Sequence, residues 1–152
     1  MKSVVFCSSV RFKKDLAAFI GELRKLAAEK GMHPVILEPN FEERPTGFDQ
    51  LHEKERLANA NYRETVGGKV YDHLFRKVRV ADVCFVFNKD GYLGANTNGE
   101  LFAAAMAGKM CYALHPKTLM GSYPGDLYEE LSSRMFIHEI VSTPEELLKR
   151  LA

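Results

Sequence analysis

The sequence lacks an apolar segment of the length that a membrane span requires. Its longest apolar runs are VVFC, VCFVF and LFAAAMA, whereas a spanning helix needs about 20 consecutive apolar residues. The N-terminus passes directly into a strand-like run, without the basic, apolar and cleavage regions of a secretion signal in series. We therefore expect no membrane association and a cytoplasmic location.

Cysteine is scarce, and its number is odd. Cys7, Cys84 and Cys111 share no metal-ligand spacing, and each lies in an apolar strand-like pattern, which indicates reduced core thiols. Apart from Glu29 and His33, no histidine is paired with a carboxylate at i, i+4 spacing, so we expect no metal. The chain also lacks a Walker motif and a G-x-G-x-x-G fingerprint, and no cofactor is expected.

Neither sign of charge is in excess. The chain has 21 Lys and Arg against 20 Asp and Glu, and the basic residues are spread along it rather than gathered with aromatic residues. This distribution predicts no nucleic-acid binding. At 152 residues the chain has the usual size of one domain and can bury about two-thirds of its unfolded surface around one core. We therefore expect a single domain over residues 1–152.

The sequence does contain a regular alternation of strand and helix patterns. Short apolar runs predict strands at residues 3–8, 35–37, 83–87, 110–114 and 135–141. Helical spacing lies between them at residues 12–27, 62–78, 97–107 and 126–134, and a capping box at 143–146 opens a final helix. This alternation predicts an α/β fold, a flavodoxin- or Rossmann-like doubly wound parallel sheet of five strands in the order 2-1-3-4-5.

Two segments interrupt this regular pattern. Residues 39–61 are polar and contain two prolines, with only a weak helical patch at 50–60, and we interpret this long excursion as a candidate lid. The helix expected at 62–78 contains Gly67 and Gly68, where we expect it to bend or break.

The loop after the first strand is a candidate binding site. In doubly wound sheets, ligands bind beyond the carboxyl ends of the strands where the strand order reverses, which here means after the first and third strands. Ser8, Ser9 and Arg11 follow the first strand and lead into a helix whose free N–H groups favour an anion. An equally good interpretation is that Ser9 caps this helix and that Arg11 is solvated.

The loop after the third strand has the richest chemistry. Its sequence, NKDGYLGANTNGE at residues 88–100, has glycines that allow close backbone approach and amides that donate and accept hydrogen bonds. These properties suit a sugar or the edge of a base. The candidate binding residues in this loop are Asn88, Asp90, Gly91, Tyr92, Gly94, Asn96 and Asn98.

Glu100, at the end of this loop, has two interpretations. Thr97-x-x-Glu100 forms a capping box, in which the carboxylate only satisfies a backbone N–H, and the spacing by itself favours this structural role. A carboxylate in the first turn of a helix is also held ionised by the helix dipole, which is the state that a nucleophile requires.

Three stretches resemble the nucleoside 2-deoxyribosyltransferase-like superfamily, which includes deoxynucleoside 5′-monophosphate N-glycosidases. They are VVFCSSVR at residues 4–11, Ala-Asp-Val at 81–83, and Gly-Tyr-Leu-Gly at 91–94 followed by Gly-Glu-Leu at 99–101 and Ala104. The resemblance covers most of the chain and indicates a less-characterised branch. It implies that Glu100 is the nucleophile and that Ser8, Ser9 and Arg11 line the sugar or phosphate end of the pocket.

The resemblance also bears on the general acid that would protonate the departing base and on the oligomeric state. Characterised members carry an aspartate where this sequence has Leu74, so Asp72 and His73 are the nearby candidates for protonating the departing base; a solvated Asp72 and a packed or exposed His73 are the alternative. In the superfamily, residues from the region of Ser122 and Tyr123 can reach the active site of a neighbouring subunit. Ser122 and Tyr123 are therefore candidates for substrate binding. A homodimer or larger homo-oligomer is therefore implied.

Two functions from different classes fit these observations. The first is an enzyme that cleaves or exchanges the N-glycosidic bond of a small-molecule nucleoside or nucleotide. The second is a non-catalytic domain that binds a nucleotide-like ligand and has lost the general acid at Leu74. A different glycosyl donor, such as a dinucleotide or a modified nucleotide, is a third possibility.

Overall fold

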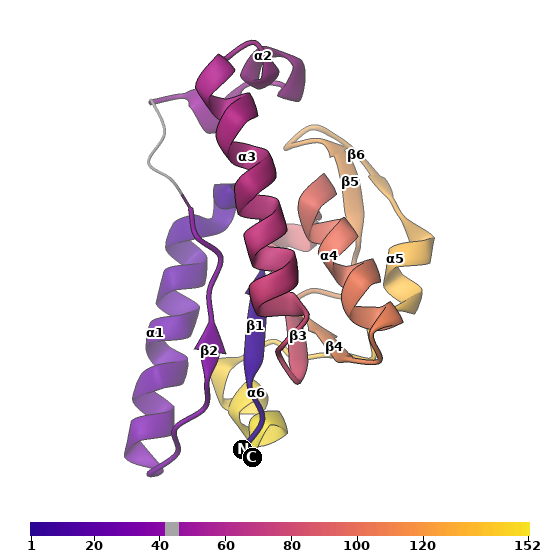
Figure 1. Cartoon of the computed structure of the whole chain (residues 1–152). Helices are drawn as coiled ribbons and strands as arrows, with labels where there is room; N and C mark the ends of the chain where they lie inside the picture. Colours follow the sequence, from indigo (N-terminus) through magenta and orange to yellow (C-terminus); the bar gives the residue numbers. More distant parts are fainter. Residues whose placement is uncertain (42–45) are drawn as a thin grey trace.

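Five parallel strands form the central sheet, in the order β2-β1-β3-β4-β7. The computed structural model of the chain describes residues 1–41 and 46–152. Its sheet strands are β1 Val4–Cys7, β2 Ile36–Leu37, β3 Val83–Val86, β4 Met110–Ala113 and β7 Glu139–Ile140. The predicted order 2-1-3-4-5 is thus confirmed when the strands of this sheet are counted alone. Figure 1 shows β1 at the centre of the fold.

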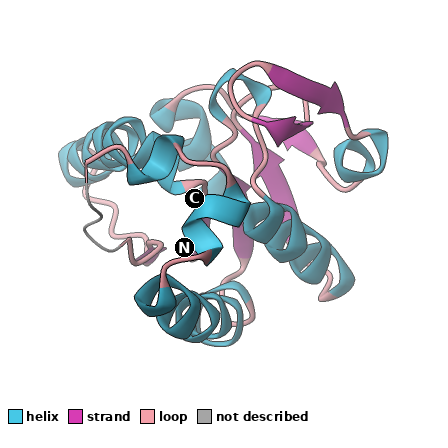
Figure 2. Cartoon of the chain, turned by 90° about the horizontal axis from the view of Figure 1, so that it is seen from above, coloured by secondary structure: helices cyan, strands magenta, loops and turns pink. Residues whose placement is uncertain are grey.

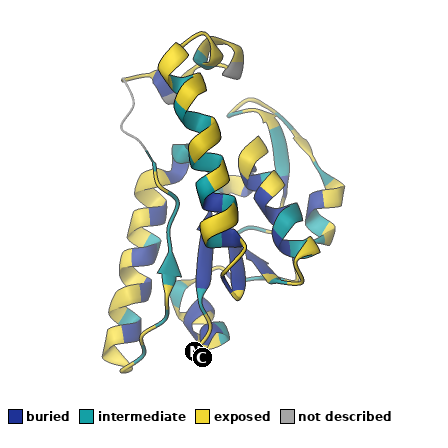
Figure 3. Cartoon of the chain, viewed as in Figure 1, coloured by how far each residue is buried: buried dark blue, intermediate teal, exposed yellow. Residues whose placement is uncertain are grey.

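Both faces of the sheet are covered by helices, because its strands are apolar on both faces. Successive side chains of a strand point to opposite faces, so Val4 and Phe6 enter one core cluster while Val5 and Cys7 enter the other. The first cluster packs under α1 Lys13–Glu29 and α6 Pro144–Leu151, and the second under α4 Ala95–Met106. Figure 2 shows helices on both sides of the strands, and Figure 3 shows β1 and β3 in the colour of buried residues.

The helix after the polar excursion differs from its prediction in one respect. α3 Ala60–His73 runs without interruption through Gly67 and Gly68, so the helix does not break there. The irregular turn comes later, in the π-helical segment η3 Leu74–Val78, where the Arg79 N–H bonds to the Leu74 carbonyl at 2.9 Å. Such wide turns occur frequently at functional sites, and this one follows directly after His73.

The excursion itself contains two short helical segments, η2 Phe48–Gln50 and α2 Glu53–Leu57. The ring of Phe48 packs edge-on against that of Tyr62, with centroids 5.4 Å apart, and attaches the excursion to α3. Residues 42–45 lie outside the described part of the chain, and the interpretation of 39–61 as a lid stays a prediction.

A second, two-stranded sheet replaces a predicted helix. β5 Leu119–Ser122 pairs antiparallel with β6 Asp126–Glu129, and only the short α5 Leu131–Met135 follows. The prediction of a helix at 126–134 is therefore wrong for residues 126–129, where backbone pairing with β5 outweighs the weak local preference for helix, and holds only for residues 131–134. The Leu93 N–H bonds to the Leu119 carbonyl at 2.7 Å, which fixes this hairpin beside the loop after β3.

The last helix forms as its sequence predicts. The Thr143 hydroxyl accepts the Glu146 N–H at 3.2 Å, the Glu146 carboxylate accepts the Thr143 N–H at 3.3 Å, and Pro144 occupies the first helical position. Within the described residues, none of the helices combines the length and the apolar character needed to cross a membrane.

Candidate active site

A cleft of about 530 Å³ opens at the carboxyl ends of β1 and β3, where the strand order reverses. Its walls come from the loops after these strands, the polar excursion, α3, the start of α4 and the β5–β6 hairpin. A cleft therefore lies at the edge of the sheet where the sequence predicts the site. Ten candidate residues line the cleft: Ser8, Ser9, Arg11, His73, Tyr92, Gly94, Asn96, Glu100, Ser122 and Tyr123.

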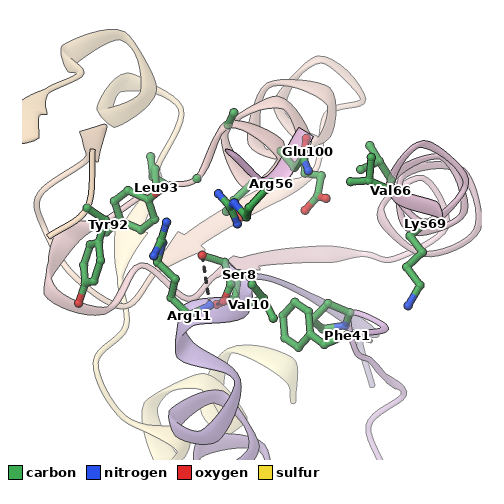
Figure 4. Close-up of a pocket in the computed structure, with 18 of the residues that line it drawn as sticks. Ser8, Val10, Arg11, Phe41, Arg56, Val66, Lys69, Tyr92, Leu93 and Glu100 are labelled. Carbon is green, nitrogen blue, oxygen red and sulfur yellow. Dashed lines mark hydrogen bonds between the residues drawn. The ribbon is translucent and has the colours of Figure 1, made fainter. Parts of the chain in front are cut away.

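Glu100 is not a helix cap. α4 begins at Ala95 with Gly94 as its N-cap residue, and no side chain caps this end. Glu100 therefore lies in the second turn of the helix, beyond the free N–H groups that a capping carboxylate would bind. Both the capping interpretation and the expectation of a carboxylate held ionised in the first turn are wrong. Figure 4 shows the carboxylate directed toward the cleft instead.

The Glu100 carboxyl is buried and has an unusual acidity. The residue is only 8 % exposed. Burial raises its pKa from 4.5 to about 7, an effect that a hydrogen bond from the Cys7 thiol partly opposes. The carboxyl is therefore divided between its ionised and protonated forms near neutral pH, which is the range where acid–base and nucleophilic groups of enzymes are tuned.

His73 lies beside Glu100 in its neutral form. Its Nε2 atom is 3.6 Å from the Glu100 Oε2 atom and 3.6 Å from the Cys7 Sγ atom. Burial, and then the charge of Lys77, lower the pKa of His73 to about 4. At neutral pH this imidazole is an uncharged neighbour of Glu100 rather than a cationic acid.

Arg11 is held at the wall of the cleft by aromatic rings. Its guanidinium carbon lies 5.8 Å from the ring centroid of Tyr92 and 5.3 Å from that of Tyr123, which is cation–π distance. Ser9 accepts the Arg11 N–H at 3.3 Å and so caps the 3-10 turn η1 Val10–Phe12 that precedes α1. The capping interpretation of Ser9 is thus confirmed, whereas the alternative of a solvated Arg11 is wrong.

Two of the predicted amides do not reach the cleft. Asn88 is completely buried: its amide donates to the carbonyls of His115 and Lys117 at 2.9 and 2.7 Å, and its oxygen accepts the His115 N–H at 3.0 Å. Asn98 faces α5, where its oxygen accepts a hydrogen bond from Ser133 at 2.5 Å. Both side chains are used to hold loops and helices in place.

Three further candidates also lie away from the cleft. Asp72 is paired with Arg76, 3.0 Å away, on an exposed part of α3, and this explains why it does not face Glu100. Asp90 is exposed in the 3-10 turn η4 Lys89–Gly91, with a left-handed φ of 55°. Gly91 adopts a φ of 85° so close to the Lys117 side chain that an added Cβ would lie 2.9 Å from its Cβ.

Asn88→Ala is expected to destabilise the protein by about 2–4 kcal/mol, because it leaves a buried N–H and two carbonyls without their partner. The free energy of unfolding from urea denaturation measures this loss. Asn96→Ala is the matched control, since this amide is exposed at the start of α4 and its loss should change stability by about 0.5 kcal/mol or less. Equal stability of the two variants would contradict the structural role of Asn88.

Several lining residues were not predicted for the site. They come from the polar excursion and from one face of α3: Phe41, Gln50, Leu51, His52, Arg56, Tyr62, Thr65, Val66, Lys69 and Val70. The four-residue spacing of Tyr62, Val66 and Val70 does predict a helix, but spacing does not tell whether an apolar face meets the core or a ligand cleft. Figure 4 shows Phe41 and Val66 with Arg56 and Lys69 around this side of the cleft.

The fold and this cleft define a doubly wound α/β protein with a cleft at the switch point of its sheet, the place where proteins of this architecture bind ligands. No protein-family model matches the sequence, and no curated protein matches it either. Several solved structures share the fold. A conserved protein from Enterococcus faecalis V583 has a TM-score of 0.56 at 14% identity, over 99% of this chain and 97% of that one.

The second structure is a 2-deoxyribosyltransferase from Bacillus psychrosaccharolyticus, with a TM-score of 0.50 at 16% identity, over 96% of this chain and 90% of that one. A CMP N-glycosidase from Clostridium botulinum has a TM-score of 0.44 at 17% identity, over 98% of each chain. This chain thus shares the α/β fold of a 2-deoxyribosyltransferase, as the sequence resemblance implied.

Proposed function

We propose that this protein cleaves or exchanges the N-glycosidic bond of a nucleoside or nucleotide, with Glu100 as the nucleophile. The observation that carries the proposal is the buried Glu100 carboxyl, which faces a cleft of about 530 Å³ at the switch point of the sheet. A cleft of this volume suits a small molecule. The fold shared with a 2-deoxyribosyltransferase used for nucleoside synthesis adds support.

The reaction proceeds by two displacements at the anomeric carbon. The ionised Glu100 oxygen attacks this carbon, and the electrons of the glycosidic bond leave with the base. The resulting glycosyl ester is then attacked by water, which gives hydrolysis, or by a second base, which gives exchange; either step releases the carboxylate. With a pKa of about 7, an adequate fraction of Glu100 is ionised at neutral pH.

The walls of the cleft supply contacts of the kinds that a nucleoside requires. The rings of Tyr92 and Tyr123 lie 4.9 Å apart, beside the Arg11 guanidinium, and offer flat apolar faces to a base. Ser8 and Ser9 bring hydroxyl groups, and Asn96 an amide, to the same cleft for the sugar or a phosphate. Tyr123 and its neighbour Ser122 serve the cleft of their own chain in this arrangement.

Protonation of the departing base is the demanding part of this reaction. His73 is neutral near pH 7, because its pKa is about 4, and Asp72 is paired with Arg76 away from the cleft. We therefore propose that the protein acts best on nucleosides whose base leaves without being protonated. An acid at this point would contribute about 10²–10⁴-fold.

N7-methylated purine nucleosides are accordingly expected to be cleaved at least about tenfold faster than their unmethylated forms, because the methylated base already carries a positive charge. The rate of base release, followed by chromatography and corrected for release without protein, measures this ratio. Equal corrected rates for the two substrates would show that the protein does supply an acid.

The test of the function is a panel of ribo- and deoxyribonucleosides and their 5′-monophosphates, each incubated with and without a second base. Release or exchange of base with at least one substrate is the expected result. If no substrate reacts while one of them raises the melting temperature of the protein, the protein is a binding domain for nucleotide-like ligands and not an enzyme.

A further inference from the structure

Three side chains of metal-binding type meet at the floor of the cleft. Cys7 ends β1, His73 ends α3, and Glu100 lies in α4. One ligand atom from each, the Cys7 Sγ, the His73 Nε2 and a Glu100 carboxylate oxygen, lies within 4.8 Å of the other two, and all three residues are buried. Two of the separations are 3.6 Å.

These separations fit the coordination of zinc. A tetrahedral Zn²⁺ ion holds sulfur at about 2.3 Å, nitrogen at about 2.0 Å and oxygen at about 2.0–2.2 Å, so its ligand atoms are about 3.3–3.6 Å apart. The Cys7–His73 and His73–Glu100 distances match that spacing without rearrangement of the backbone. The third separation, between the Cys7 sulfur and the Glu100 oxygen, is within 4.8 Å, so rotation of these side chains is needed to place one ion between the three atoms.

The charges and the donor types also fit a divalent ion. When an ion binds, Cys7 gives up its thiol proton and Glu100 any carboxyl proton. The resulting thiolate and carboxylate, with a neutral imidazole, balance the two positive charges. The occupied site would carry no net charge, and burying it would therefore cost little free energy. The combination of sulfur, nitrogen and oxygen donors is typical of zinc, whereas calcium and magnesium prefer oxygen alone.

We propose that Cys7, His73 and Glu100 form a Zn²⁺ site with its fourth position open to the cleft, and that the bound ion withdraws Glu100 from nucleophilic attack. His73 and Glu100 both line the cleft, so an ion can enter from there and water can complete the tetrahedron. Zinc then acts as a reversible inhibitor of the glycosidic reaction. The metal site itself does not depend on that reaction.

The test is a titration of the chelator-treated, full-length protein with Co²⁺, which takes zinc sites and absorbs light. The expected result is a thiolate-to-cobalt charge-transfer band together with the intense visible bands of tetrahedral cobalt. These bands saturate at one ion per chain, and Zn²⁺ displaces them. Absence of the charge-transfer band in wild-type protein at saturating Co²⁺ overturns the proposal.

Two variants separate this site from other thiols. Cys7→Ser should abolish the charge-transfer band and weaken Zn²⁺ binding at least about 100-fold, since even outer-shell changes cost 10–100-fold. Cys84→Ser is the matched control: this thiol is equally buried and lies 3.8 Å from the Cys7 sulfur, but it is not one of the three ligands. A band that persists in Cys7→Ser, or that both variants lose, contradicts the site.

Glu100→Gln gives an independent readout if Cys7→Ser fails to fold, which thermal denaturation of each metal-free variant reveals. This variant should retain a thiolate band at high Co²⁺ but bind Zn²⁺ at least about tenfold more weakly. Unchanged Zn²⁺ affinity overturns the proposal. In wild-type protein that releases base, Zn²⁺ should inhibit and a chelator should restore the rate; a protein that releases no base still reports the site through its cobalt spectrum.

Discussion

Glu100→Gln is expected to lower kcat/KM for base release or exchange by at least about 10³-fold, because loss of a covalent nucleophile removes the reaction path itself. The replacement keeps the size of the side chain and its position in the second turn of α4. Steady-state rates with the best substrate of the nucleoside panel measure the effect, at pH 8, where most of the wild-type carboxyl is ionised.

Glu22→Gln is the matched control for this prediction. Glu22 lies on the exposed surface of α1, where it forms an ion pair with Lys25 at 3.8 Å, far from the cleft. Its replacement should leave kcat/KM unchanged. The wild-type kcat/KM should also rise with pH and level off above about pH 7, as Glu100 becomes ionised. Retention of activity within tenfold by Glu100→Gln would exclude the nucleophilic role.

The same substitution is expected to make the protein more stable at alkaline pH, by about 3 kcal/mol at pH 8. The folded-state pKa of Glu100 is raised from 4.5 to about 7 by burial, so the folded protein holds this proton more tightly than the unfolded chain. Its contribution is fully present below pH 4.5 and is lost as the pH rises through 7. Glutamine does not titrate, and the variant avoids this loss.

His73→Gln should show the opposite pH dependence. The pKa of His73 falls from 6.5 in the unfolded chain to about 4 in the folded protein, so wild-type stability is lost as the pH falls from 6.5 through 4. Relative to wild type, His73→Gln should gain about 3 kcal/mol between pH 7 and pH 4. Urea denaturation of both variants and wild type at pH 4, 6 and 8 measures these differences. Parallel pH profiles for the two variants would contradict the assigned burial effects.

Local patterns were reliable where the structure depends on neighbours in sequence. The capping box at Thr143 and Glu146 forms as predicted, because its partners are three residues apart. The apolar strands and their order were also predictable, since strands buried on both faces leave few arrangements for a βα chain. The segment at 126–134 was not, because its pairing with β5 depends on a partner strand outside its own pattern.

The candidate site residues likewise divide into features that the sequence predicted and features that depend on tertiary packing. The loops after β1 and β3 contain the cleft as predicted, yet the amides of Asn88 and Asn98 turn inward to hold other segments. The residue type shows that an amide can form hydrogen bonds, but it does not show which partner the amide binds in the folded protein. For Glu100, a start of α4 at Ala95 moves the residue from the first turn to the second and changes a cap into a group that faces the cleft.

By itself, the sequence predicted the alternation of strands and helices, the sheet order and the edge of the sheet where the cleft lies, and its resemblance to a known family made Glu100 the candidate nucleophile. Only the tertiary structure decided the surroundings of that residue. Cys7 and His73 are 66 residues apart in the chain and meet beside Glu100 because β1, α3 and α4 pack together. This packing excludes water from the side chains, and the resulting desolvation, which no local sequence pattern predicts, shifts the pKa values of His73 and Glu100.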